Sequence, residues 1–323
     1  MVLRAGISKV TYRVGDWQQL SPNCSSEFIS AAAATEVVSR GFEGFSELRE
    51  NPSVTCELVV RDLLHSTHLH PGMIDGAIIS CANRVDDDLE SSIYRTLNKL
   101  GLEAATVFQL GFNACSALPL SLGLAKRMVE AETHQNVLAL TFGSAKLDGR
   151  RVGPNGTTVF SDGAAACLIS CRTSFMEILY EKTLISTRLG GSSRGMPGYE
   201  VGAEAMKLLA VVCRNLIAWL EVNGKEITQV VCSNSNAASF YIVADLMNVD
   251  VDLVFSANLE RFGHVYGADP LISLQSAYDT GKFCTGDIVV ALGWSLHSVS
   301  GCVLRCTSSA SESSVANIGP VLT

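Results

Sequence analysis

Two short segments contain side chains that could together perform covalent acyl transfer. The first, GFNACSALPLSLGLAKRM, carries Cys115 between a predicted strand and a predicted helix. The unpaired N–H groups and the positive dipole end at a helix N-terminus favour the thiolate, which is the nucleophilic form of cysteine. Backbone N–H groups of the same turn could also bind an oxyanion. The local sequence is equally compatible with a buried structural cysteine.

The second segment, RFGHVYGADP, carries His264 between two glycines, and Asp269 directly before a proline. The glycines indicate a turning backbone, and an Asp-Pro pair is typical of the start of a helix. Asp269 is therefore either an ordinary helix N-cap or a carboxylate that orients the histidine. In the second case Cys115, His264 and Asp269 would supply a nucleophile, a base and an orienting group.

The residues around these segments alternate between short apolar strands and longer helices. Helices are expected over residues 58–69, 89–100, 116–132, 201–222 and 237–247 and from residue 270, and strands over 76–80, 105–110, 137–142, 164–170, 229–232, 252–256, 287–293 and 298–305. Short apolar strands separated by helices are typical of a sheet that is covered on both faces. The expected fold class is therefore α/β.

The two halves of the sequence repeat one pattern. A helix beginning at Pro119 leads to the strand NVLAL and then Gly-Ser, and a helix beginning at Pro270 leads at the same spacing to DIVVAL and then Trp-Ser. This pattern predicts an internal duplication, with an N-terminal half over residues 1–171 and a C-terminal half over residues 172–323. The loops with the cysteine and the histidine would then be related by a pseudo-dyad, so they could face each other in one site.

Composition excludes several classes of protein. The 323 residues are 47% hydrophobic and carry a net charge of −8, which argues against nucleic acid or an anionic membrane as the main partner. The N-terminus alternates apolar and polar residues, unlike a signal peptide. Lys207 and Arg214 interrupt the most apolar helical stretch, so it is a core helix rather than a membrane span. We therefore expect a cytoplasmic protein, whose eleven cysteines, without a CxxC pair, are reduced.

Five segments, in this order, resemble the thiolase superfamily and, within it, β-ketoacyl-carrier-protein synthase III. They are FNACSALPLSLGLAKRM, VFSDGAAACLIS, VVCSNSNAASF, RFGHVYGAD and DIVVALGWSLHSVSGCVLRC. The resemblance covers most of the chain and implies a duplicated five-layer αβαβα fold. It also implies a homodimer paired through the strand before the nucleophile. No bound cofactor is implied, because acyl-CoA or a phosphopantetheinyl acyl carrier protein delivers the acyl group as donor substrate.

Two positions depart from the condensing members of this family. Those members carry a Cys-His-Asn set, with the histidine in a PHQAN-like segment and the asparagine in an HGN-like segment. In this sequence Ser233 stands at the histidine position and His264 at the asparagine position. A branch of ketosynthase III-like acyltransferases of antibiotic biosynthesis keeps the cysteine, places a histidine at the asparagine position and has an aspartate five residues later. The spacing of His264 and Asp269 matches that branch.

The resemblance to this branch implies a role for each residue. Cys115 would be acylated, His264 would act as general base on the oxygen, nitrogen or sulfur of a small-molecule acceptor, and Asp269 would orient the imidazole. The backbone N–H groups of Cys115 and Trp294 would form the oxyanion hole. Candidate pocket residues are Ser233, Asn236 and His297. Three histidines in LLHSTHLH lack a carboxylate or cysteine partner, so we interpret that segment as a helix end and expect no metal site.

Two other functions remain open from the sequence. A divergent condensing enzyme would form a carbon–carbon bond, but Ser233 and Asn236 would have to replace the missing histidine, and both are very weak bases. A catalytically silent subunit would stabilise an active homologue in a heterodimer. Such a subunit has no physical need to retain Cys115, His264 and Asp269 together.

Overall fold

A single sheet of nine strands runs through the molecule. The computed structural model describes residues 3–21, 27–153, 156–172, 174–192 and 197–308. The strands of the sheet follow the order β5-β4-β6-β7-β1-β8-β11-β10-β9. Their bounds are β1 Gly6–Val14, β4 Gly76–Cys81, β5 Thr106–Leu110, β6 Asn136–Gly143, β7 Gly163–Ser170, β8 Met176–Ile185, β9 Gln229–Cys232, β10 Ile288–Trp294 and β11 Ser298–Cys306.

The sheet consists of two halves with the same pattern of pairing. In the first half β4 is parallel to β5 and β6, and β7 and β1 follow antiparallel. In the second half β9 is parallel to β10, and β11 and β8 follow antiparallel. The halves join where Gly6 and Ile7 of β1 pair with Glu177 and Met176 of β8. This repeated order confirms the predicted duplicated fold.

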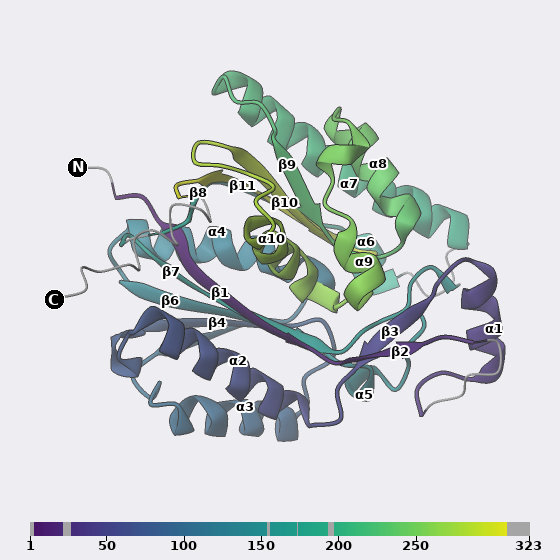
Figure 1. Ribbon diagram of the computed structural model, residues 1–323, viewed down its shortest axis with the longest axis horizontal. Helices are drawn as coiled ribbons and strands as arrows, with labels where there is room; N and C mark the ends of the chain where they lie inside the picture. Colours follow the sequence, from purple (N-terminus) through teal and green to yellow (C-terminus); the bar gives the residue numbers. More distant parts are fainter. Residues whose placement is uncertain (1–2, 22–26, 154–155, 173, 193–196, 309–323) are drawn as a thin grey trace, which may run out of the picture.

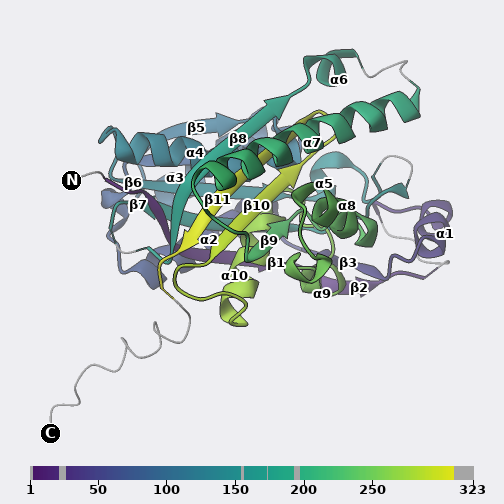
Figure 2. The same cartoon turned by 90° about the horizontal axis from the view of Figure 1, so that it is seen from above.

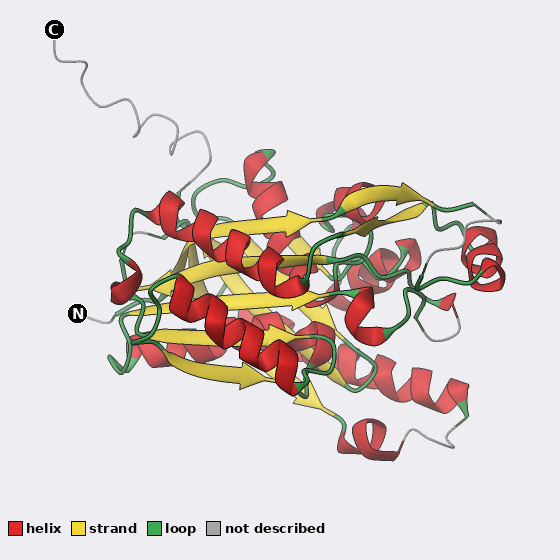
Figure 3. Ribbon diagram, turned by 90° about the horizontal axis from the view of Figure 1, so that it is seen from below, coloured by secondary structure: helices red, strands yellow, loops and turns green. Residues whose placement is uncertain are grey.

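Helices form three layers around the two halves of the sheet, which gives five layers in all (Figure 1). Helices α2 and α3 cover the outer face of the first half (Figure 3), and α7 and α8 cover the outer face of the second (Figure 2). Helices α4 and α10 lie between the halves. The bounds are α2 Pro52–Thr67, α3 Asp87–Lys99, α4 Ala117–Glu130, α7 Gly198–Val222, α8 Ala237–Met247 and α10 Asp269–Asp279. The predicted αβαβα architecture is confirmed.

The position of each helix follows from how its apolar residues are distributed. In α10 nine of eleven residues are buried, because a helix covered on both sides needs apolar or small residues all round. In α7, by contrast, the buried residues form one stripe from Leu209 to Leu220 that packs on β8 and β11. Asn51 and Asp86 accept hydrogen bonds from the first turns of α2 and α3 and fix where these helices begin.

Shorter elements complete the chain and form the loops at the site. They are β2 Asp16–Gln19, β3 Gly44–Glu47, α1 Ala31–Ser39, α5 Ala145–Asp148, α6 Thr187–Ser192, α9 Ala257–Phe262, and the 3-10 turns η1 Pro71–Met73, η2 Ala114–Ser116, η4 Val251–Leu253 and η5 Tyr266–Ala268. The β2–β3 hairpin forms a separate two-stranded sheet at the side of the molecule (Figure 1).

Most predicted elements are confirmed, and one strand is wrong. The predicted bounds of β9 and α8 agree with the structure residue for residue. In place of a strand over residues 252–256 the structure has the end of η4, Val251–Leu253, followed by an isolated parallel bridge from Val254 to Val230. The Asp250 carboxylate accepts a hydrogen bond from the Asp252 N–H and stabilises the turn. This turn occupies the place where the second half would have its outermost strand.

Three further observations concern membranes, metals and cysteines. No helix in the described part of the chain is long and apolar enough to cross a membrane. Within the same residues no group of three or more His, Cys, Asp or Glu side chains could hold a metal ion. The LLHSTHLH segment does end helix α2, with His68 as a left-handed C-cap, so that interpretation is confirmed. The ten cysteines of the described residues form no disulfide with one another, and eight of them are buried.

Candidate active site

Cys115 lies in the tight turn that joins β5 to α4. The turn is the 3-10 element η2, and its first residue, Ala114, has a φ of +46°. A non-glycine residue in this left-handed region is strained, so the surrounding structure must hold the turn in place. The Cys115 side chain is 8% exposed, at the N-terminal end of α4. The sequence expectation of a cysteine at a strand-to-helix turn therefore holds.

Asp269 directs its carboxylate back to the histidine rather than to its own helix. Its Oδ2 is hydrogen-bonded to Nδ1 of His264 and accepts from the backbone N–H of Asn234 at 2.7 Å. Its Oδ1 accepts from the backbone N–H of Val265 at 2.7 Å. Asp269 is the first residue of α10, the cap position belongs to Ala268, and the carboxylate is fully buried. Of the two interpretations left open by the sequence, the structure supports a carboxylate that orients the imidazole.

The two turns from opposite halves of the molecule lie in contact with each other. Gly267 of η5 approaches η2 so closely that an added Cβ would lie 3.6 Å from Cα of Cys115. Burial lowers the pKa of His264. The Asp269 carboxylate and the hydrogen-bonding Cys115 sulfur together raise this pKa by more than burial lowers it, so that it lies at about 10. Because Asp269 engages Nδ1, Nε2 is the ring nitrogen left for the sulfur. The structure thus brings Cys115, His264 and Asp269 together.

Phe160 packs against the imidazole and fixes its plane. The ring centroids of Phe160 and His264 are 5.4 Å apart, and Phe160 stacks on Tyr266 at 4.5 Å. The backbone N–H of Ser161 donates to the carbonyl of His264 at 2.8 Å. The loop of the histidine is therefore bound to the segment VFSDG of the first half, which the sequence had marked only as part of the family resemblance.

A fully buried ion pair, which the sequence did not reveal, supports that segment. The Arg151 guanidinium bonds the Asp162 carboxylate at 3.1 Å, and neither side chain is exposed. Arg151 also donates to the carbonyl oxygens of Ser46 and Phe160 and lies over the Phe45 ring. Asp162 accepts from the backbone N–H groups at positions 48 and 145. Residues 45–48 are thus tied to residues 145–162 behind the histidine.

The three candidate pocket residues differ in their surroundings. Ser233 is fully buried, and its Oγ has no hydrogen-bond partner among the described residues. Asn236 caps α8 through the N–H of Ser239 and donates to the carbonyl of Thr157, so its amide has a structural role. His297 is half-buried, and its Nε2 is bonded to the carbonyl of Phe112 at 2.9 Å. The sequence reasoning missed Asn234, whose N–H holds the Asp269 carboxylate.

Strand β10 passes directly behind the nucleophile. A Cβ added to Gly293 would lie 3.0 Å from the carbonyl oxygen of Cys115. The strand then turns, and the Ser295 N–H donates to the Ser298 carbonyl at 2.7 Å. Because neighbouring pairs of an antiparallel ladder alternate between bonded and non-bonded, the N–H of Trp294, which pairs with Val299, is directed away from β11.

Comparison with known proteins places this architecture in a family. A family model for the C-terminal part of 3-oxoacyl-[acyl-carrier-protein] synthase III matches residues 218–305. The β-ketoacyl-[acyl-carrier-protein] synthase III of Sulfurimonas denitrificans is 25% identical over 217 residues, which are 59% of this chain and 64% of that relative. The structure of this chain is similar to that of ChlB3, described as an acyltransferase. The TM-score is 0.79 at 15% identity, and the match covers 96% of this chain and 99% of ChlB3. The chain is thus similar in sequence to ketosynthase III and has the fold of ketosynthase III-like proteins of the thiolase superfamily.

The structures of synthases show the same fold. The 3-oxoacyl-[acyl-carrier-protein] synthase III of Aquifex aeolicus has a TM-score of 0.75 at 19% identity, covering 93% of this chain and 99% of the synthase. A ketosynthase III-like fold therefore extends over both halves of the chain, beyond the segment that the family model matches. The named relatives include both synthases and an acyltransferase, so the fold is compatible with either reaction.

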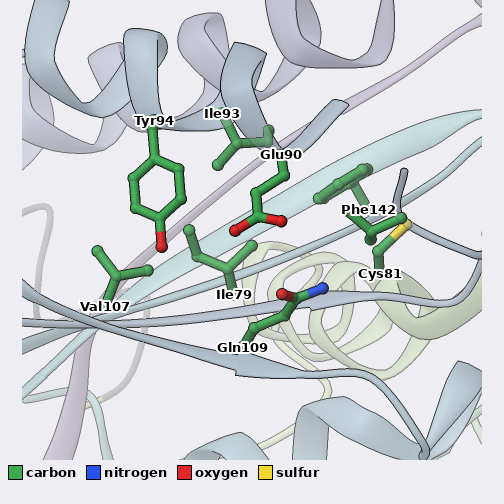
Figure 4. A pocket seen from close by; sticks show the side chains of 9 residues that line it. Ile79, Cys81, Glu90, Ile93, Tyr94, Val107, Gln109 and Phe142 are labelled. Atoms are coloured by element: carbon green, nitrogen blue, oxygen red, sulfur yellow. The ribbon is translucent and has the colours of Figure 1, made fainter. Parts of the chain in front are cut away.

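A small cavity in this ketosynthase III-like protein lies on the outer face of the first half of the sheet. It lies between α3 and strands β4, β5 and β6, and Figure 4 shows Glu90 and Tyr94 on one side of the Ile79 side chain and Gln109 on the other. Its volume is about 40 Å³, enough for a few water molecules but not for an acyl chain. Helix α4 lies on the other face of the sheet (Figure 1). We therefore assign this cavity no part in acyl transfer.

Proposed function

We propose that this protein is an acyltransferase that moves an acyl group from a CoA or carrier-protein thioester, through an acyl-Cys115 intermediate, to the oxygen, nitrogen or sulfur of an acceptor in the biosynthesis of a secondary metabolite. The observation that carries the proposal is the buried carboxylate of Asp269 on Nδ1 of His264. A histidine oriented in this way is a general base, whereas condensation uses a neutral asparagine at that position. ChlB3, which shares the fold, is described as an acyltransferase.

The first half-reaction is thiol exchange. The Cys115 thiolate attacks the carbonyl carbon of the donor thioester, and the pantetheine thiolate leaves. The His264 imidazolium gives its Nε2 proton to that thiolate, so the donor departs as a neutral thiol. The raised pKa of His264, about 10, keeps the imidazole protonated near neutral pH for this step.

The second half-reaction uses the same imidazole as a base. Acylation removes the charge of the Cys115 sulfur, which is one of the causes of the raised pKa of His264, so that pKa falls. Nε2 then accepts the proton of the acceptor group while that group attacks the acyl carbon. The Cys115 thiolate leaves, and the starting imidazolium–thiolate pair is restored. Asp269 stabilises the imidazolium throughout without changing its own protonation state.

The oxyanion of each tetrahedral intermediate would be bound by the backbone N–H groups of Cys115 and Trp294. Cys115 is at the N-terminal end of α4, where N–H groups are unpaired. The N–H of Trp294 points out of the β10–β11 ladder, and Gly293 holds that strand against the Cys115 backbone. Because both donors are backbone groups, they do not depend on which side chains these two residues carry.

The condensing alternative lacks a second base. It would need Ser233 and Asn236 in place of the missing histidine, but the Asn236 amide caps α8 and bonds Thr157. A serine hydroxyl does not accept a proton near neutral pH, so it could not share the work of His264 in generating and holding an enolate.

Intact-mass spectrometry after incubation with a panel of acyl-CoA and acyl carrier protein donors tests the proposal. We expect the wild type to gain the mass of one acyl group and to lose it on addition of an acceptor. Cys115→Ala should gain nothing. His264→Ala should acylate slowly and retain the group, because the acceptor is then not deprotonated.

Cys284→Ala is the matched control, since this thiol is exposed and distant in sequence from the site. It should acylate like the wild type. Normal labelling of Cys115→Ala would exclude the acyl-Cys115 intermediate, and a wild type that takes no label from any donor would favour the silent subunit. Release of CO2 from malonyl donors with formation of a β-keto product would favour the condensing enzyme.

We also propose a homodimer formed through strand β5. This strand is at the edge of the sheet and has no neighbour on its outer side. Three large side chains along it and on the adjacent helix are exposed, Tyr94 at 51%, Phe108 at 39% and Phe112 at 86%. An open edge strand with exposed aromatic residues is typical of a surface that pairs with another strand.

Light scattering coupled to size-exclusion chromatography tests the dimer. We expect twice the mass of the chain for the wild type and a monomer for the double variant Phe108→Asp and Phe112→Asp, because charges would be buried at the paired edge. Val222→Asp is the control, because Val222 at the end of α7 is 87% exposed and α7 packs on β8 and β11, in the half of the sheet that does not contain β5. A monomeric wild type, or a dimeric double variant, would contradict this interface.

A further inference from the structure

Three buried side chains form a closed ring of hydrogen bonds directly behind the nucleophile turn. Ser116 Oγ donates to the Asn113 carbonyl at 2.8 Å, and the Ser116 and Ser298 hydroxyls lie 2.6 Å apart. Asn113 Nδ2 donates to Ser298 Oγ at 3.1 Å. Since Ser116 uses its only proton on the carbonyl, Ser298 must be the donor in the hydroxyl pair. Each hydroxyl and the Asn113 amide thus has a partner without any charged group.

This ring joins the two halves of the molecule at the cysteine. Asn113 and Ser116 flank the Ala114–Cys115 pair, whereas Ser298 begins β11. All three side chains are at most 5% exposed. Ser298 also accepts, through its carbonyl, the Ser295 N–H of the turn that follows Trp294. One residue therefore contacts both the nucleophile turn and the turn proposed to carry the second oxyanion donor.

The backbone of the nucleophile turn needs such a restraint. Ala114 has a φ of +46°, which an alanine adopts only when neighbouring contacts enforce it. The Ser116 N–H and Oγ both bond the Asn113 carbonyl, so this local contact closes the turn. The Ser298 hydroxyl ties that closed turn by hydrogen bonds to strand β11, which lies outside it. Without the Ser298 hydroxyl, Ala114 could relax toward ordinary dihedral angles, and the sulfur would shift with it.

We propose that Ser298 is a positioning residue for Cys115, which it holds through Ser116 and Asn113 at the distance that the imidazole and the oxyanion donors require. The proposal rests on the proposed function for the role of Cys115 as nucleophile. Displacements of about 1 Å at a reacting atom can lower rates by about 100-fold. The loss of Ser298 Oγ should therefore reduce kcat and leave KM nearly unchanged.

The rate of alkylation of Cys115 by iodoacetamide, read by peptide mass spectrometry, measures this position without any acyl donor. We expect Ser298→Ala to lower the rate about 10-fold and to change its pH profile, because the sulfur loses its fixed distance to His264. The exposed thiol of Cys284 gives an internal reference in every sample. A wild type that never acylates would overturn the proposed function but would leave this comparison of thiol reactivity intact.

Ser300→Ala is the matched control on the same strand. Ser300 is fully buried and its hydroxyl accepts a hydrogen bond from Thr183 at 2.8 Å, but it does not contact the nucleophile turn. We expect both alanine variants to lose similar stability in urea, whereas only Ser298→Ala loses thiol reactivity. Equal alkylation rates in the two variants would overturn the proposal.

A second variant covers the case in which Ser298→Ala does not fold. Ser116→Ala removes the other hydroxyl of the pair and should lower the alkylation rate by a similar factor. If both fold, the double variant should be no slower than either single variant, because the two hydroxyls act as one contact. Rates that multiply in the double variant would show that Ser298 acts on something other than the Ser116 turn.

Discussion

The turn that carries Cys115 and the turn that carries His264 occupy corresponding places in the two halves, but different chemistry holds them. Cys115 lies within the 3-10 element η2, whereas His264 precedes the 3-10 element η5. Each element leads into a middle-layer helix and begins with a non-glycine residue of positive φ, Ala114 in η2 and Tyr266 in η5. Hydroxyl and amide groups hold the cysteine turn. A buried carboxylate, Asp269, holds the histidine turn.

The cysteine turn is held by neutral groups and the histidine turn by a charged one, so the two turns should respond differently to pH. The side chains that hold the cysteine turn, those of Asn113, Ser116 and Ser298, are neutral over the working range of pH, so the position of this turn should not depend on pH. The Asp269 carboxylate instead fixes the His264 loop and raises the pKa of the imidazole at the same time. A change at Asp269 should therefore affect both structure and proton transfer, whereas a change at Ser298 should affect position alone.

The largest expected effect comes from removing the charge that holds the histidine turn. Asp269→Asn keeps the size of the side chain but lets its amide donate to Nδ1 of His264. The neutral imidazole then carries its proton on Nε2, which faces the sulfur and can no longer accept the proton of the acceptor group. We expect the transfer of the acyl group to fall about 10³-fold, by analogy with the loss of an orienting carboxylate in other triads. Single-turnover kinetics of acyl loss from the enzyme measure this step.

Asp279→Asn is the control for Asp269→Asn, because Asp279 is an exposed residue at the other end of α10 that bonds only Gln275 among the described residues. It makes the same change in net charge and should leave the rate unchanged. If the two variants were equally active, the carboxylate of the histidine turn would have no part in the reaction.

A smaller effect should appear in the pH dependence of stability. The pKa of His264 is raised from its usual value of 6.5 to about 10 in the folded protein. Protonation of this imidazole therefore stabilises the fold fully at a pH below 6.5, and the contribution is lost as the pH rises toward 10. We expect the free energy of unfolding of the wild type to fall by on the order of 2 kcal/mol more than that of His264→Gln between pH 7 and 9.

Urea titrations at several pH values measure this difference. Buried thiols such as Cys81, whose pKa burial raises to about 12, also lower stability at high pH, but they are common to both proteins and cancel in the comparison. If the free energies of unfolding of the two proteins changed in parallel with pH, the imidazole would not be protonated in the folded state. The histidine turn would then not differ from the cysteine turn in carrying a charge.

Local patterns predicted the elements of the sheet well but failed where a side chain redirects the backbone. The apolar run at 229–232 and the helix at 237–247 have their predicted bounds, because hydrophobic periodicity and the Asn236 cap are local signals. The predicted strand at 252–256 is apolar enough, but Asp250 bonds the backbone and makes a turn. The first fifty residues were not assigned, although β1 lies at the centre of the sheet.

The candidate site could be predicted only as far as its residues stand in recognisable segments. Cys115, His264 and Asp269 lie in such segments, and the duplication predicted that their loops meet; their catalytic roles stay a prediction, as does the division at residue 171. Ser298 and Arg151 gave no signal, because their partners are far away in sequence. A hydroxyl or guanidinium is satisfied only by the tertiary fold, which no local pattern describes.

The buried Arg151 makes the outlying β2–β3 hairpin indispensable. Its guanidinium takes two acceptors from that hairpin, the Ser46 carbonyl and the Glu47 carboxylate, and the remaining ones from its own loop. A shortened chain that lacks the hairpin would keep a cation in the interior with too few oxygens around it, and such a charge is very costly to bury. The two strands that resemble an appendage in outline thus supply oxygen atoms that the buried cation needs, and a chain trimmed of them should lose stability.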